Sequence, residues 1–188
     1  TEIIYREDSK RLAELPDLLG FPIVLKIPDG SFSRGIVKVE DAESLKARAE
    51  ELFQSTSLLL AQEYLFTEFD WRIGILDGEP LYACQYFMSR GHWQIYNHGS
   101  PSTRFTTGGY DTMPTYEVPK AVLDAALKAT KLIGTSLYGV DLKQVGDRAM
   151  VIEVNDNPSI ESDVEDKYLD MQLYEQIMQE FVNRIEAK

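Results

Sequence analysis

The sequence contains only one cysteine, Cys84, and only two histidines among its 188 residues. One cysteine cannot form an internal disulfide or a thiolate metal cluster, so we expect a reducing, cytoplasmic setting. Basic residues are also scarce, because 19 Lys and Arg stand against 31 Asp and Glu and give a net charge of −12. This charge argues against a nucleic-acid partner, since such proteins gather cations along a phosphate backbone.

Long apolar runs are absent as well. No apolar stretch reaches the roughly 18 residues of a membrane span, and residues 1–15 do not have the pattern of a signal peptide, so no membrane partner is expected. The chain instead has an ordinary globular balance, with 44% hydrophobic and 27% charged residues. Its length allows a proper core, in one domain or in two small lobes.

Hydrophobic periodicity predicts strands and helices in an interleaved order. Asp41 is a suitable cap for a helix over 41–53, and Asp77-Gly78 is a strong signal for a hairpin turn. Within the polar segment 89–118 we expect at most a short strand at 93–96. The remaining expected elements are strands at 21–27, 35–39 and 57–64, hairpins at 69–76/79–88 and 140–145/149–155, and helices at 119–137 and about 169–185. This order is typical of an α+β fold.

The second hairpin carries three oxygen-bearing side chains. With a three-residue loop at 146–148, Asp141 lies directly opposite Glu153, with Cβ atoms roughly 5 Å apart. Asn155 shares their face because strand side chains alternate. Opposed carboxylates repel unless a cation lies between them, and three hard oxygen ligands suit Mg²⁺.

The alternative for this hairpin is an exposed ribbon with acidic residues on its wet face. Against that alternative, the neighbouring apolar side chains look buried on both faces. These side chains are Val140, Leu142, Val151, Ile152 and Val154.

Lys26 interrupts an apolar strand and precedes a loop that contains Gly30 and Ser31 and ends at Gly35. Such a loop can fold over phosphates with its backbone N–H groups. It is not a P-loop, because Ile36 and Val37 occupy the places of the Lys-Ser/Thr pair. The alternatives are an ordinary hairpin turn and a lysine that snorkels from a sheet edge.

The segment Gln62-Glu63-Tyr64-Leu65 leaves a buried strand and precedes Asp70 and Arg72. Backbone groups at a strand exit can pair with an adenine edge, and a carboxylate a few residues later can bind ribose hydroxyls. Asp70 and Arg72 alternate onto one strand face, within reach of each other. The alternative is a surface salt bridge beside a connecting segment.

Taken together and in this order, these segments resemble the ATP-grasp superfamily, most closely the RimK-like carboxylate–amine ligases, over nearly all of residues 20–160. The resemblance implies two α+β lobes with mainly antiparallel sheets that clasp a nucleotide. A small lobe of residues 1–62 would carry the glycine-rich lid loop, and a large lobe of residues 63–188 would carry the metal site. The family also has an upstream domain before the point that matches residue 1, so we expect this chain to be inactive alone.

The resemblance further implies a role for each candidate residue. ATP and Mg²⁺, with Mn²⁺ as an alternative metal, are the implied cofactors. The roles are phosphate contact for Lys26, lid loop for Gly30 and Ser31, adenine pocket for Gln62, Glu63, Tyr64 and Leu65, ribose for Asp70, charge neutralisation in catalysis for Arg72, and metal ligation for Asp141, Glu153 and Asn155.

The implied reaction joins a carboxylate to an amine through an acyl-phosphate intermediate. The substrates would be an amino acid, a peptide or a protein. RimK-like enzymes carry Arg-Ser-Asn where this chain has Gln94-Ile95-Tyr96, so glutamate is not implied as the transferred amine. Two alternatives remain on sequence grounds: a phosphotransferase of the same fold, and a non-catalytic nucleotide-binding module.

Overall fold

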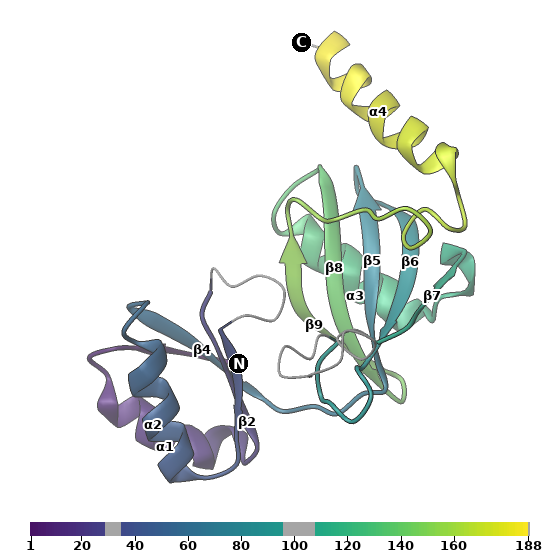
Figure 1. Ribbon diagram of the computed structural model, residues 1–188. Helices are drawn as coiled ribbons and strands as arrows, with labels where there is room; N and C mark the ends of the chain where they lie inside the picture. Colours follow the sequence, from purple (N-terminus) through teal and green to yellow (C-terminus); the bar gives the residue numbers. More distant parts are fainter. Residues whose placement is uncertain (29–34, 96–107, 188) are drawn as a thin grey trace. The chain divides into compact units, whose positions relative to one another are not determined.

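The computed structural model describes residues 1–28, 35–95 and 108–187, and the chain divides into two compact units, residues 1–66 and 67–188 (Figure 1). Both units combine helices with an antiparallel sheet, so the α+β prediction is confirmed. The division into a small functional lobe of residues 1–62 and a large one of residues 63–188 stays a prediction. Gly30 and Ser31 lie outside the described residues.

The first unit has a four-stranded antiparallel sheet in the order β1-β4-β2-β3. Its elements are β1 (Glu2–Tyr5), α1 (Ser9–Leu19), β2 (Ile23–Lys26), β3 (Ile36–Val39), α2 (Ala42–Leu52) and β4 (Leu58–Glu63). Asp41 caps α2 as predicted, since its side chain accepts a hydrogen bond from the Ser44 backbone N at 2.8 Å. One sheet face packs on both helices, where Ile23 and Leu25 of β2 meet Leu15 and Leu45.

The second unit has a five-stranded antiparallel sheet in the order β7-β6-β5-β8-β9. Its elements are β5 (Phe69–Leu76), β6 (Glu79–Phe87), β7 (Tyr110–Met113), the 3₁₀ helix η2 (Thr115–Glu117), α3 (Lys120–Lys131), β8 (Leu137–Val145), β9 (Arg148–Asn155) and α4 (Met171–Glu186). Asp77 and Gly78 join β5 to β6 with φ angles of 50° and 83°, which confirms the predicted tight hairpin turn.

The two faces of this second sheet are covered differently. Helix α3 packs on one face, where Ile73 and Val140 meet Val122 and Ala126 in the core (Figure 1). On the other face, Leu173 at the start of α4 packs with Leu81, Tyr82 and Cys84 of β6. Asp70 and Arg72 of β5 and Asp141 and Lys143 of β8 alternate with the core residues that α3 covers, so they lie on the face away from α3.

Three expectations about the elements were wrong or incomplete. Strand β1 and helix α1 were not expected at all. Helix α3 ends near residue 132 instead of 137, because the backbone N of Gly134 bonds back to the carbonyl of Thr130 and β8 begins at Leu137. Residues 93–95 form bends and no strand, and Tyr96 lies outside the described residues. Among the described residues of this region, the strand is β7.

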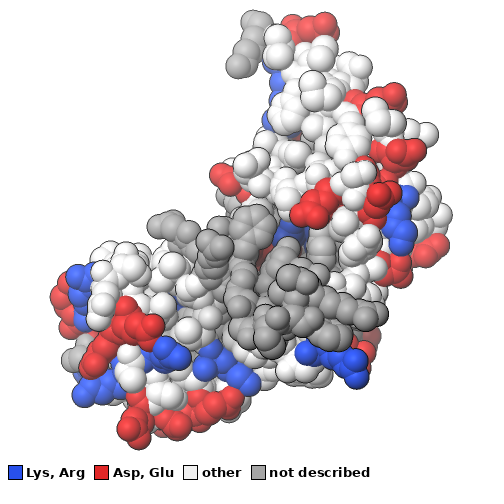
Figure 2. Space-filling model, in the orientation of Figure 1, with Lys and Arg blue, Asp and Glu red and all other residues white. Residues whose placement is uncertain are grey.

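Acidic side chains are spread over the visible surface of both units, in keeping with the net charge (Figure 2). No helix in the described ranges is long and apolar enough to cross a bilayer.

Candidate functional site

Three neighbouring strands bring charged side chains to the sheet face away from α3. Arg72 on β5 pairs in register with Asp141 on β8, and Asp141 pairs with Glu153 on β9. Asn155 lies two residues beyond Glu153 on the same strand, so it shares this face. The structure thus brings four of the sequence candidates together.

The pairing of Asp141 with Glu153 was predicted for a reason that proves partly wrong. The loop has two residues, since Val145 pairs with Arg148, and not the three that we expected. That register alone would place Glu153 on the opposite face. A β-bulge corrects it, because Leu142 pairs with Val151 while Asp141 pairs with Glu153, and Ile152 is the additional residue in β9.

Burial of the flanking apolar side chains differs between the two strands of this hairpin. Val140 and Leu142 are fully buried on β8, as expected. Val151 is 37% exposed, and Ile152 and Val154 are half-buried, so the expected burial on β9 was wrong. The reason is the strand order: β8 lies between two strands, whereas β9 is the edge of the sheet.

Arg72 holds Asp141 through two hydrogen bonds. Its Nε donates to Oδ1, and its Nη2 donates to Oδ2 at 2.9 Å. Both side chains are largely buried, with 17% and 20% exposed. Burial alone would lower the pKa of Arg72, but the Asp141 carboxylate raises it above its ordinary value.

Gly139 allows Arg72 to lie across β8. A Cβ at this position would come within 3.2 Å of Arg72 Cδ and within 2.7 Å of Pro158 Cβ. Only a residue without a side chain fits such a close approach without displacing its neighbours.

Asn155 links the two opposed carboxylates. Its Nδ2 lies 3.4 Å from Asp141 Oδ2, 3.5 Å from Glu153 Oε1 and 3.3 Å from the carbonyl oxygen of Gly139. In the described ranges, no three side chains from His, Cys, Asp and Glu are grouped so as to hold a metal ion. The candidate set here is instead two carboxylates and one amide, all of them hard oxygen donors of the kind that Mg²⁺ and Mn²⁺ accept.

Asp70 has partners that the sequence did not suggest. We expected it beside Arg72, but its ion pair is with Lys143, at 2.5 Å from Nζ to Oδ1, and the Thr67 hydroxyl donates to the same oxygen at 2.9 Å. Burial raises the pKa of Asp70, while Lys143 and Thr67 act in the opposite direction. Lys143 follows Asp141 by two residues, so strand alternation could have marked it as lying on the same face.

In the first unit, Lys26 is 8% exposed on β2, which has β4 on one side and β3 on the other. The interpretation of Lys26 as a snorkelling edge residue was therefore wrong. Leu25 belongs to the helix-covered core, so the alternating Lys26 lies on the other sheet face. Gln62 pairs with Val24, which places Gln62 on this face too.

The rest of the segment 62–65 follows the end of β4. Glu63 is the last residue of the strand, and Leu65 lies in the irregular connection after it. The Tyr64 backbone N donates to the carbonyl of Pro22 at 3.2 Å, and Lys38 Nζ lies 4.8 Å from the centroid of the Tyr64 ring. These contacts tie the start of the connection to the sheet of the first unit.

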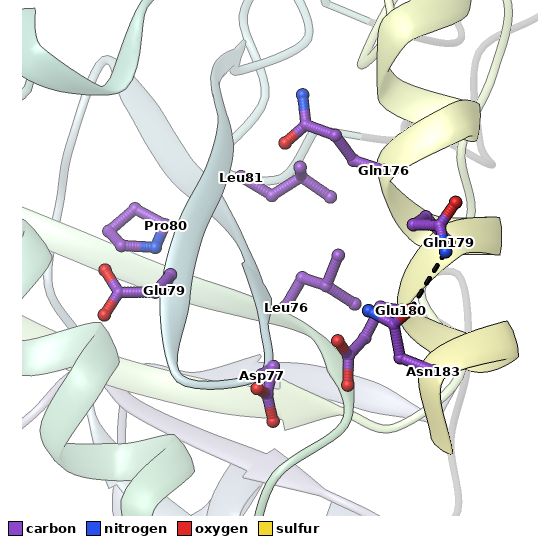
Figure 3. A pocket seen from close by; sticks show the side chains of 9 residues that line it. All are labelled: Leu76, Asp77, Glu79, Pro80, Leu81, Gln176, Gln179, Glu180 and Asn183. Atoms are coloured by element: carbon purple, nitrogen blue, oxygen red, sulfur yellow. Dashed lines mark hydrogen bonds between the residues drawn. The ribbon is translucent and has the colours of Figure 1, made fainter. Parts of the chain in front are cut away.

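A cavity of about 300 Å³ lies in the second unit where the β5–β6 turn faces α4 (Figure 3). Acidic and amide side chains form much of its wall. Its lining residues are Leu76, Asp77, Glu79, Pro80, Leu81, Gln176, Gln179, Glu180 and Asn183. None of the described candidate residues lines it, so this cavity is separate from the charged sheet face.

Comparisons with known proteins agree with this architecture. The sequence model of a family described as "RimK: RimK-like ATP-grasp domain" matches residues 2–181. A probable alpha-L-glutamate ligase of Aeromonas salmonicida is 25% identical over 154 residues, which are 79% of this chain and 48% of that relative. The chain thus spans about half the length of the curated relatives that it matches.

Solved structures give the same fold. The crystal structure of a D-alanine–D-alanine ligase from Bacillus anthracis matches with a TM-score of 0.77 and 21% identity, covering 100% of this chain and 63% of that one. The same enzyme complexed with ATP matches with a TM-score of 0.74 and 22% identity, covering 100% and 62%. At this level of identity, these matches establish the fold alone.

Proposed function

Because the chain belongs to the RimK-like ATP-grasp domain family, we propose that it is the ATP-grasp portion of an ATP- and Mg²⁺-dependent carboxylate–amine ligase. The single observation that carries the proposal is the cluster of Arg72, Asp141, Glu153 and Asn155 on one sheet face. Residues 1–62 would act as the small lobe and residues 63–188 as the large lobe, together with an upstream domain of the same protein.

The proposed reaction has two steps. A substrate carboxylate oxygen attacks the γ-phosphorus of ATP, the bond to the β,γ-bridging oxygen breaks, and an acyl phosphate and ADP form. The nitrogen of an amine then attacks the acyl carbon, phosphate leaves, and the amine loses a proton to give the amide. The name of the curated relatives, probable alpha-L-glutamate ligase, supports an amino acid or a peptide as the substrate class.

For nucleotide binding we carry over the residue roles that the family resemblance implies. Lys26 is a buried cation, and its ammonium group would form a charge-assisted hydrogen bond with a phosphate oxygen. We assign Gly30 and Ser31 to the loop over the phosphates and Gln62 to Leu65 to the adenine. Asp70 would accept hydrogen bonds from the ribose hydroxyls.

The oxygen donors of Asp141, Glu153 and Asn155 fit Mg²⁺ or Mn²⁺, and we propose that these three residues hold the metal. When bound, Mg²⁺ supplies positive charge that offsets the phosphate oxygens. Arg72 leaves one guanidinium nitrogen, Nη1, without a hydrogen-bond partner among the described residues. We assign this nitrogen to the transferring phosphate, where Arg72 would stabilise the charge that develops in the transition state.

The test is to incubate the full-length protein with ATP, Mg²⁺ and a panel of amino acids and peptides, and to measure phosphate release and product mass. Amide product with amine-dependent phosphate release supports the ligase. Phosphate retained on the acceptor would identify a kinase instead, and ATP binding without turnover would identify a binding module.

A double variant, Asp141→Asn with Glu153→Gln, should abolish the metal-dependent turnover. The matched control is Asp147→Asn, which changes an exposed acid at the turn of the same hairpin and should leave turnover unchanged. We also propose a cytoplasmic location, where ATP and Mg²⁺ are abundant and the one cysteine stays reduced.

A further inference from the structure

A closed triangle of hydrogen bonds lies at the start of the second unit. Lys143 Nζ donates to Thr67 Oγ1 at 2.8 Å and to Asp70 Oδ1 at 2.5 Å, and Thr67 Oγ1 donates to the same Asp70 oxygen at 2.9 Å. Thr67 precedes β5, Asp70 is its second residue, and Lys143 comes from β8. The triangle therefore ties the beginning of β5 to the strand that carries Asp141.

The triangle is shielded from water. Thr67 is 8% exposed, and the side chains of Asp70 and Lys143 are 19% and 16% exposed. A desolvated ion pair with a third polar partner holds its geometry better than an exposed pair, because water competes less for each donor.

The two oxygens of the Asp70 carboxylate are used unequally. Oδ1 accepts two of the three hydrogen bonds of the triangle, whereas Oδ2 accepts none from the residues that the structure describes. Two donors on one oxygen fix the plane of the carboxylate and leave the other oxygen able to accept hydrogen bonds from a ligand.

We propose that Lys143 and Thr67 are positioning residues that fix Asp70 for recognition of the ribose hydroxyls of ATP. This inference rests on the proposed function and adds two residues to it. Lys143 places a positive charge against the buried carboxylate and orients it, and Thr67 closes the triangle from the segment that enters β5. Preorganisation of this kind raises affinity because the acceptor loses little freedom when the ligand arrives.

The experiment compares ATP with 2′-deoxy-ATP and 3′-deoxy-ATP in the full-length protein. Dissociation constants and KM and kcat values are measured for the wild type and for K143M, K143R and T67V. Lys131→Met is the control, since Lys131 is exposed at the end of α3, which covers the other sheet face. Circular dichroism and melting curves establish that each variant is folded.

We expect the wild type to prefer ATP over at least one deoxy analogue by about tenfold or more, the range for a hydrogen bond to a charged group. K143M should reduce this preference to within about threefold, mainly by raising the KM for ATP. T67V should lie between K143M and the wild type, K143R should recover most of the preference, and K131M should match the wild type.

Two results would overturn the inference while the proposed function stands. One is an undiminished preference for ATP in folded K143M and T67V, which would make the triangle purely structural. The other is an equal loss of affinity for all three nucleotides in K143M, together with unchanged affinities in T67V. That result would place Lys143 on the phosphates. Failure of the wild type to bind any of the nucleotides would instead overturn the proposed function, and this inference with it.

Discussion

Replacing Arg72 with methionine should destabilise the second unit and make its stability depend more strongly on Mg²⁺. Arg72 supplies the positive charge beside the opposed carboxylates of Asp141 and Glu153. Methionine has a similar length and no charge, so Asp141 would lose both guanidinium hydrogen bonds and keep only the amide of Asn155.

The size of the effect follows from burial. Removing one partner of a fully buried ion pair costs about 3–5 kcal/mol, and exposed pairs contribute about 0–1 kcal/mol. With 17% and 20% of the two side chains exposed, we expect a loss of about 2–3 kcal/mol. For a chain of this length, that loss corresponds to a fall in Tm of about 4–12 °C.

The assay is thermal unfolding of the purified protein in EDTA and in increasing Mg²⁺. A metal that binds only the folded state at 100 times its Kd adds about 2.7 kcal/mol. Because the variant lacks the cation that is hydrogen-bonded to Asp141, the rise in Tm with Mg²⁺ should be larger in R72M than in the wild type. Arg72→Lys should be intermediate, since lysine keeps the charge but not the two-pronged geometry.

Arg148→Met is the matched control, because Arg148 is an exposed arginine next to the turn of the same hairpin, and its Tm should stay within about 2 °C of the wild type. The reasoning would be refuted if R72M were as stable as R148M in EDTA. It would also be refuted if Mg²⁺ raised the Tm of R72M no more than that of the wild type.

Three further outcomes are expected. Lys26→Ala in the full-length protein should weaken ATP binding about tenfold or more in a calorimetric titration, because a charge-assisted contact contributes about 1.5–3 kcal/mol. Unchanged affinity would remove Lys26 from the site. Gly139→Ala should cost about 1–3 kcal/mol in a urea titration, since its Cβ would crowd Pro158 and Arg72, whereas Gly109→Ala, which meets nothing within 4 Å, should not. Burial raises the pKa of the Cys84 thiol to about 12, so the folded state keeps a proton that the unfolded chain releases from about pH 9 upward. This thiol's contribution to stability should therefore be complete below pH 9 and fall between about pH 9 and 12, and Cys84→Ala should lose stability less steeply in that range, a difference that parallel urea titrations would detect or disprove.

Much of the fold was predictable because many of its contacts are local. The positive φ angles at Asp77 and Gly78 follow from residue types that tolerate them, and the Asp41 cap follows from a short side chain that reaches the Ser44 backbone. Helix α1 also carried a readable signal that we overlooked, since Asp8 accepts a hydrogen bond from the Arg11 backbone N at 2.9 Å. Strand β7 was missed because it pairs with β6 across a long polar connection.

The sequence by itself determined which residues of the candidate site exist and that Asp141 and Glu153 lie in one hairpin. It did not determine their register. The bulge at Ile152 offsets the shorter loop, and no residue type at that position predicts a bulge. The partners of the charged side chains were decided only by tertiary structure. Arg72 meets Asp141 across 69 positions and Asp70 meets Lys143 across 73, and both contacts require β5 to lie beside β8. Pairing between strands so far apart depends on how the whole sheet buries its apolar face against α3, and local patterns of hydrophobicity do not encode that choice.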